Sequence, residues 1–372
     1  MVFLNDAYLI LENGEVFKGK SFGNDAQAVG ELVFTTGMVG YLETLSDPSY
    51  YGQIVLQTFP LIGNYGVIPP DFGPGPVHLA AYIVREWCQE PSNFRSEGNL
   101  DSFLRKKGIP GLCGIDTRAL TRILREKGVV NAMVSKTPDL SEAQWAELRG
   151  HRLTGAVEAC SHSKEMIKAK GASLDSACAS HDLGNNSELR VSNPEFKVAI
   201  WDFGDAFRLA DGLAARGYAA ATVPFNASIE DLLALNPDGI VLSGGPGDPA
   251  ENTLIIEEIR KLCGKAIPIL GVGLGHQLLA LARGAKTIKL PFGHRGANQP
   301  VSEPETGRLF VTSQNHGYTV APDSLPDNAV MSYVNSNDET CEGIDYKDIR
   351  AFSVQFQPTD EIFDKFIKYA RG

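Results

Sequence analysis

Several features that assign function in other proteins are missing from this sequence. No stretch approaches the run of about eighteen apolar residues that a membrane span needs. No block of Lys and Arg offsets the formal net charge of −11, which argues against a nucleic-acid partner. The first residues, MVFLNDAYLI, lack the basic start of a signal peptide. We therefore expect a cytoplasmic protein that binds neither membrane nor nucleic acid.

The cysteines also lack any functional spacing. None forms a CxxC pair, and no HxxxH motif accompanies them, so neither a zinc site nor a disulfide framework is indicated. Reduced thiols of a cytoplasmic protein are the expected state. The six lie at positions 88, 113, 160, 178, 263 and 341.

What is present is the composition of a soluble globular protein, with 43% hydrophobic and 21% charged residues. The 372 residues suffice for two domains of ordinary size. The composition and the pattern of expected strands and helices change twice along the chain, and we place the domain boundaries at these changes. Residues 1–154 form the first expected domain, 155–195 a polar connector without a convincing period, and 196–372 the second domain.

Residues 1–154 are rich in short β-type runs. A turn at Asn13-Gly14 separates two strands, and residues 30–37 and 53–57 read as further strands bounded by Gly, Pro or Asp. Residues 100–107 and 117–127 have the apolar spacing of helices, the second capped by its Thr117. We predict a β-rich α/β domain.

Residues 196–372 alternate strands with helices, which is typical of a doubly wound parallel sheet with helices on both faces. Its central stretch is IPILGVGLGHQLLALA, in which the apolar strand 267–270 leads through a tight glycine turn into a helix. This is the frame of a nucleophile elbow. At its tip stands Gly273, which has no side chain and cannot attack a substrate.

Eight blocks of sequence resemble one family in the family's own order. They are TGMVGYLETLSDPSY, PLIGNYG, EPSNFRS, GIDTRALTRILREKG, LSGGPGDP, GLGHQLLALARGAKT, GHRGANQPV and TSQNHGY. Together they resemble the small subunit of carbamoyl-phosphate synthetase, a class I glutamine amidotransferase.

The resemblance implies a fold and a partner. The fold is an N-terminal β-rich domain joined to a flavodoxin-like glutaminase domain. The partner is a large subunit that carries the ATP and metal sites and makes carbamoyl phosphate for arginine and pyrimidine synthesis. No cofactor is expected in this chain.

In that family a cysteine at the elbow attacks the amide of glutamine, a histidine activates it, and a glutamate two residues further on orients the histidine. This sequence departs at all three positions, with Gly273 for the cysteine, Gln357 for the histidine and Thr359 for the glutamate. The first βα loop, DFGDAFRLADGL, also lacks the family's usual lysine and asparagine. Three losses together predict a site that no longer hydrolyses glutamine.

Much of the substrate pocket nevertheless matches the family. Gly245 and Leu274 would offer backbone N–H groups to an oxyanion. The glycines are equally explained by tight turns and close packing. His276, His294 and His316 read as structural hydrogen-bonding residues. By resemblance the glutamine-contacting positions are Ser49, Gly245, Gly247, Leu274, Gln277, Asn315, Gly317 and Tyr318.

Three functions remain open at this point. The first is a pseudo-glutaminase that supports an ammonia-using synthetase subunit or regulates it. The second is a working glutaminase, which needs a replacement nucleophile. Cys263 and Cys341 are poor candidates, because Cys263 precedes the elbow strand and so lies at the opposite edge of the sheet, and Cys341 has no histidine near it in sequence. The third is a stand-alone protein that binds glutamine or another amide.

Overall fold

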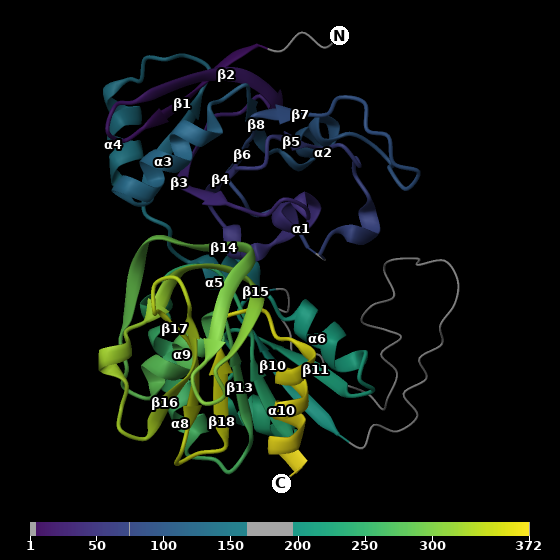
Figure 1. Cartoon of the computed structure of the whole chain (residues 1–372), viewed down its shortest axis with the longest axis vertical. Coiled ribbons are helices and arrows are strands. Elements are labelled where there is room, and N and C mark those ends of the chain that lie inside the picture. The colour runs from purple at the N-terminus through teal and green to yellow at the C-terminus, as the bar shows by residue number, and fades with distance from the viewer. Residues whose placement is uncertain (1–4, 74, 162–195, 372) are drawn as a thin grey trace. The chain divides into compact units, whose positions relative to one another are not determined.

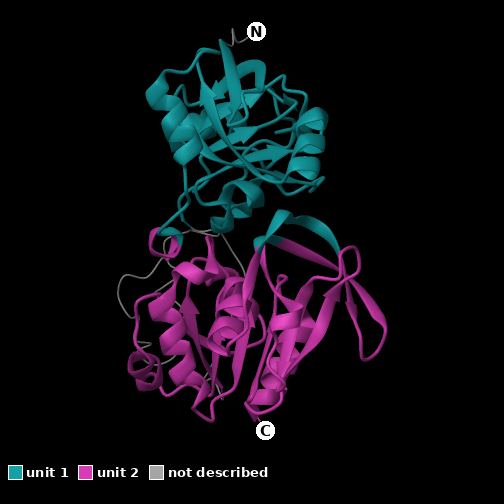
Figure 2. Ribbon diagram, turned by 90° about the vertical axis from the view of Figure 1, so that its left-hand side faces the viewer, with its two compact units in different colours: residues 1–156, 289–299, 315–317 teal, residues 157–288, 300–314, 318–372 magenta. Residues whose placement is uncertain are grey.

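The computed structural model describes residues 5–73, 75–161 and 196–371. Contacts within the chain divide it into two compact units, coloured separately in Figure 2. Unit 1 comprises residues up to 156 together with 289–299 and 315–317, and unit 2 comprises 157–288, 300–314 and 318 onward. Most of the connector expected at 155–195 lies outside the described residues, but its first part forms the helix α5 (Ala156–Cys160).

Unit 1 is built around a closed β-barrel of seven strands (Figure 1). The barrel closes because β9 pairs antiparallel with both β1 and β3. Large apolar side chains such as Leu9, Leu32 and Ile54 fill it. Around the barrel the strands follow the order β1 (Asp6–Leu11), β2 (Val16–Gly23), β8 (Pro110–Cys113), β6 (Ala81–Ile83), β4 (Gln53–Gln57), β3 (Ala28–Thr35) and β9 (Val130–Ser135).

Helices and short segments connect and cover the barrel strands of unit 1. The predicted helices at 100–107 and 117–127 are confirmed as α2 and α3, but the expected cap at Thr117 is wrong. The side chain of Asp116 caps α3 by accepting from the Ala119 N–H at 3.0 Å, because Thr117 is already the first helical residue. The other elements are α1 (Tyr41–Ser46), η1 (Pro48–Tyr50), β5 (Leu61–Ile62), η2 (Pro69–Asp71), β7 (Glu86–Trp87) and α4 (Glu142–Gly150).

Unit 2 contains a nine-stranded mixed sheet. Its first five strands are parallel, which confirms the doubly wound expectation, and β17, β16 and β14 extend the sheet in antiparallel fashion, with β15 at the edge. The order is β11 (Ala219–Pro224), β10 (Lys197–Asp202), β12 (Gly239–Leu242), β13 (Ile269–Val272), β18 (Ala351–Val354), β17 (Cys341–Tyr346), β16 (Ala329–Asn335), β14 (Thr287–Glu303) and β15 (Arg308–Val320).

Helices cover both faces of this sheet (Figure 1). Alternate residues of β10 point to opposite cores, with Trp201 in one and Ile200 in the other. The first core is completed by α7 (Ile229–Ala234), α8 (Thr253–Cys263) and α9 (Leu274–Ala282). The second is completed by α6 (Phe207–Ala214) and α10 (Asp360–Arg371). Two 3₁₀ turns, η4 (Pro249–Glu251) and η5 (Pro322–Ser324), complete unit 2.

The strand before the elbow starts later than predicted. The apolar run suggested 267–270, whereas β13 covers Ile269–Val272. Pro268 cannot donate a ladder hydrogen bond, and its carbonyl accepts from Ile240 at 2.9 Å, so regular pairing begins one residue further on. The shift brings β13 directly up to Gly273. Among the described residues, every helix is too short or too polar to traverse a lipid bilayer.

Candidate functional site

The elbow joins β13 to α9 in unit 2, and Gly273 stands at its tip with φ 54° and ψ −111°. Residues with a side chain rarely adopt such a positive φ, except in strained turns such as the nucleophile elbow. The backbone at Gly273 therefore has the conformation expected of an elbow tip. The Gly273 N–H donates to the Val354 carbonyl at 2.9 Å, which ties the tip to β18. A Cβ at this position would lie 3.4 Å from the Gly244 Cα and 3.9 Å from the Gln355 carbonyl oxygen. The position therefore has room for a side chain that the sequence does not supply.

Two backbone segments meet beside the elbow. A Cβ on Gly245 would lie 2.1 Å from the Phe203 carbonyl oxygen, so only glycine fits there, and 3.1 Å from Leu274 Cδ2. Gly245 and Leu274, both predicted oxyanion donors, are thus neighbours. Leu274 is the first residue of α9, so its N–H lacks an intrahelical acceptor. Gly247, with φ 92°, turns the same loop toward η4.

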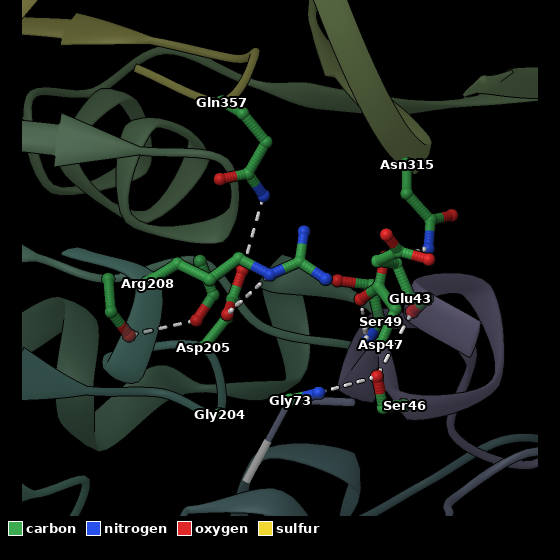
Figure 3. Close-up of polar contacts among 12 residues, drawn as sticks. Glu43, Ser46, Asp47, Ser49, Gly73, Gly204, Asp205, Arg208, Asn315 and Gln357 are labelled. Carbon is green, nitrogen blue, oxygen red and sulfur yellow. Dashed lines mark hydrogen bonds and ion pairs between the residues drawn. The ribbon is translucent and has the colours of Figure 1, made fainter. Parts of the chain in front are cut away.

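At the position of the expected base, the Gln357 side chain forms a contact of its own. Its Nε2 donates to Asp205 Oδ2 at 3.2 Å (Figure 3). Asp205 is 6% exposed, and its backbone N–H donates to the Gly244 carbonyl at 3.0 Å. Its other carboxylate oxygen lies 4.0 Å from Arg208 Nε. A carboxamide has no basic nitrogen, so Gln357 cannot take a proton as an imidazole does.

Thr359 does not reproduce the missing carboxylate. It is exposed, and its backbone carbonyl accepts from the N–H groups of Ile362 and Phe363 at 3.1 and 3.2 Å. These bonds start α10, so the residue has a structural place at a helix N-terminus. These bonds use only the backbone, so nothing in the structure explains the threonine side chain at this position.

Gln277 lies in the second turn of α9 and is 3% exposed. Its Nε2 donates to the Tyr318 carbonyl at 2.7 Å and to Gln355 Oε1 at 2.8 Å. These bonds link α9, β15 and the segment after β18. Both Gln277 and Tyr318 were predicted to contact glutamine, and the structure brings them together.

Three further predicted positions lie in unit 1. Ser49 follows α1 in the short helix η1, and its N–H donates to Asp47 Oδ1 at 2.9 Å. Asn315 Nδ2 donates to the other oxygen of the same carboxylate, also at 2.9 Å (Figure 3). A Cβ on Gly317 would lie 3.1 Å from Arg295 Nη2. Asp47 thus contacts two of these positions, and Arg295 lies beside the third.

The three histidines in the matching motifs contact other side chains of the protein. His276 is completely buried, its Nδ1 lies 2.8 Å from Ser353 Oγ, and burial lowers the pKa of its imidazole to about 3. It is therefore neutral at ordinary pH. The rings of His294 and His316 in unit 1 meet edge to face, with centroids 4.9 Å apart.

Buried thiols offer no ready replacement for the missing nucleophile. Burial raises the pKa of Cys263 to about 11 and that of Cys341 to about 12, so both remain protonated near neutral pH. Cys160 of α5 is 2% exposed. It adjoins the first βα loop, because a Cβ placed on Gly204 of that loop would lie 3.1 Å from the Cβ of Cys160. Cys178 lies outside the described residues.

Sequence reasoning missed four side chains that organise these positions: Asp47, Asp205, Arg208 and Gln355. Asp47 lies in the matching block TGMVGYLETLSDPSY, but it is not among the positions expected to contact glutamine. For Asp205 and Arg208 there was a signal, because charged residues directly after a buried strand fall at the sheet edge where ligands bind in such folds. Gln355 gave no signal, since its bond to Gln277 joins residues 78 positions apart.

Comparison with known proteins agrees with this geometry. Residues 199–360 match the family model described as glutamine amidotransferase class-I, which gives the class of unit 2. Residues 9–134 match the model described as carbamoyl-phosphate synthase small chain, CPSase domain. The chain belongs to the carbamoyl-phosphate synthase small-chain family.

Its similarity to members of that family extends over nearly the full length. The carbamoyl phosphate synthase small chain of Clostridium perfringens is 43% identical over 372 residues, which cover 98% of this chain and 99% of that protein. The small chain of Fusobacterium nucleatum is 45% identical and covers 97% of each. The pyrimidine-specific small chain of Halalkalibacterium halodurans is 43% identical, covering 97% and 96%.

Proposed function

We propose that this chain is a small-chain homologue that has lost glutamine hydrolysis and acts as a structural or regulatory partner of an ammonia-using synthetase large subunit. The observation that carries the proposal is Gly273, which occupies the elbow tip in the nucleophile's backbone conformation without a side chain. Attack on an amide carbon needs a nucleophilic atom, and none is attached at this point. ATP and metal sites are expected on the large subunit and not on this chain.

The other two departures strengthen the proposal. Even a displaced thiol would need a base, and the carboxamide of Gln357 is held by Asp205 instead of offering a basic nitrogen. Loss of one member of a nucleophile–base unit typically lowers the rate by about four to six orders of magnitude, and further losses add little. Any residual rate would then come only from substrate binding and the backbone N–H donors.

A glutaminase assay tests the proposal directly. The purified chain is incubated with glutamine, and glutamate release is followed with and without a large subunit. We expect release at least about 10⁴-fold slower than that of a small chain carrying cysteine, histidine and glutamate at the three positions. Release at a comparable rate would overturn the proposal and favour the working-glutaminase alternative.

If release is observed, the structure names the residue to examine. Cys160 is the thiol that adjoins the first βα loop through Gly204. Activity abolished by Cys160→Ala and retained in Cys263→Ala would identify Cys160 as a replacement nucleophile.

The alternative of a stand-alone amide-binding protein is favoured by one observation, the retention of all eight matched pocket positions. Calorimetry with glutamine and co-purification with a large subunit separate it from the main proposal. Glutamine binding by a chain that captures no large subunit would support the binding protein. Capture of a large subunit would support the synthetase partner, whose pathway would be arginine or pyrimidine synthesis.

A further inference from the structure

Asp47 connects two of the matched glutamine positions in unit 1. It terminates α1 and is 9% exposed. Its Oδ1 accepts from the Ser49 N–H at 2.9 Å, and its Oδ2 accepts from Asn315 Nδ2 at 2.9 Å (Figure 3). One carboxylate therefore fixes the backbone of Ser49 and the side chain of Asn315 at the same time.

The contact with Asp47 also decides which way the Asn315 amide points. An ionised carboxylate only accepts hydrogen bonds, so it selects the NH₂ group of the amide and turns the oxygen away. That oxygen, Oδ1, is buried and has no hydrogen-bond partner within the described protein. A buried acceptor without a donor is costly, and a ligand N–H would satisfy it.

A buried cation lies within electrostatic range of Asp47. Arg295 is 4% exposed; desolvation lowers the pKa of its guanidinium, while the nearby acidic groups of Tyr50, Glu31 and Asp47 act in the opposite direction. Its Nη1 donates to the Phe292 carbonyl at 2.6 Å. A buried charge must be compensated, and Asp47 is one of the three groups that favour the protonated guanidinium of Arg295.

We propose that Asp47 is a positioning residue for ligand binding: it holds Ser49 and orients Asn315 so that Asn315 Oδ1 accepts a hydrogen bond from an N–H of an amino-acid amide. This inference rests on the proposed glutamine pocket and assigns within it a role to a residue that does not touch the ligand. The ligand group that Asn315 recognises is then a hydrogen-bond donor, either the ammonium or the carboxamide NH₂ of glutamine.

The first experiment is calorimetric titration of the full chain with glutamine. Asp47→Asn keeps an acceptor for Ser49 but places an NH₂ group against the NH₂ of Asn315, so we expect the dissociation constant to rise about ten- to a hundredfold. The control is Asp25→Asn, at a surface aspartate of the same unit that pairs with Lys136, and it should bind as the wild type does. A thermal melt of each variant separates weaker binding from unfolding.

A charge swap distinguishes positioning from a general packing role. In Asp47→Asn combined with Asn315→Asp, residue 47 becomes the donor and residue 315 the acceptor, and an oxygen of residue 315 still faces the ligand. We expect the double variant to bind glutamine more tightly than Asp47→Asn alone. A double variant weaker than both single variants would contradict the proposal.

Two ligand analogues identify the recognised donor. Glutaric acid monoamide lacks the ammonium of glutamine, and glutamate lacks the carboxamide NH₂. If Asn315 recognises the ammonium, replacing glutamine by glutaric acid monoamide should raise the dissociation constant more for the wild type than for Asp47→Asn. If Asn315 recognises the carboxamide NH₂, glutamate should show this difference instead.

The possible outcomes separate the two proposals. Wild-type binding that is unaffected in Asp47→Asn rejects the positioning role and leaves the proposed function intact. No detectable glutamine binding by the wild type rejects the glutamine pocket, and the positioning role with it.

Discussion

At the scale of single residues, the proposed loss of hydrolysis depends on the backbone conformation of Gly273, a residue without a side chain. Gly273 retains φ 54° and ψ −111°, values that cost a side-chain-bearing residue about 1–3 kcal/mol. Enzymes tolerate that strain because it presents a nucleophile. Here glycine adopts the same turn without the penalty, so the turn itself is retained by its neighbours, including the bond from the Gly273 N–H to Val354.

Restoration of the missing groups follows from this geometry. Because a Cβ at position 273 would meet only ordinary contacts, Gly273→Cys should fold with a loss of about 1–3 kcal/mol. Gly273→Cys alone lacks a base and should remain inactive. Combined with Gln357→His and Thr359→Glu, it should release glutamate measurably faster than the wild type, at least about 100-fold.

The matched control for the restoration is Gly273→Ser in the same background, since a hydroxyl is a weaker nucleophile than a thiol at neutral pH. Equal activity of the two triple variants would show that the restored elbow does not act through the thiolate. A triple cysteine variant with no gain would mean that the frame at Gly273 is no longer competent.

His276 gives a pH-dependent prediction at the same scale. Burial lowers the pKa of the folded imidazole to about 3, whereas the unfolded side chain titrates near 6.5. Between these values the unfolded state binds a proton that the folded state does not, so stability falls as the pH is lowered from about 6.5 toward 3. The slope from this residue approaches 1.4 kcal/mol per pH unit.

Urea unfolding at several pH values tests the role of His276. His276→Gln removes the titrating ring, so its stability should fall less between pH 6 and pH 5 than that of the wild type, by up to about 1.4 kcal/mol. The difference between the two proteins isolates this residue from the carboxylates that also titrate. Parallel stability curves would show that His276 charges as readily in the folded protein as in the unfolded one.

At the scale of elements, the sequence located local structure well and non-local pairing poorly. The elements β4, α2 and α3 have the predicted bounds, because apolar spacing and flanking Gly or Pro residues specify them locally. The closure of the barrel by β9 was not predictable, since it depends on pairing Leu9 with Val134. The antiparallel extension of the sheet in unit 2 depends on similarly distant pairs.

The same distinction applies to the candidate site. The elbow was predicted from a contiguous stretch, and the strand, turn and helix are confirmed. The bonds Asp47–Asn315 and Gln357–Asp205 join residues 268 and 152 positions apart, so no local pattern could reveal them. Family resemblance predicted positions that would contact a ligand, but not the residues that form hydrogen bonds with them.

The cap of α3 provides a prediction at the element scale. Asp116→Ala removes the acceptor for the Ala119 N–H and should lower the free energy of unfolding by about 1 kcal/mol. Asp116→Asn keeps a capping oxygen and should change it by only a few tenths of a kcal/mol. Denaturant titration of both variants gives the comparison, and equal losses would show that the cap contributes through charge alone.

At the scale of the whole molecule, each of the two units matches one of the two family models. Unit 1 holds the barrel that matches the small-chain model, and unit 2 holds the amidotransferase fold. Retention of both in a chain without triad side chains is expected if folding and partner binding are still used. Under the proposed function, glutamine hydrolysis is the one property that this chain has lost.

The most direct test of this account is carbamoyl phosphate synthesis by the chain reconstituted with a large subunit. Glutamine and ammonium are compared as nitrogen sources at saturating ATP and bicarbonate. The account predicts synthesis with ammonium and none above background with glutamine. Equal synthesis from glutamine, abolished when this chain is omitted, would contradict it.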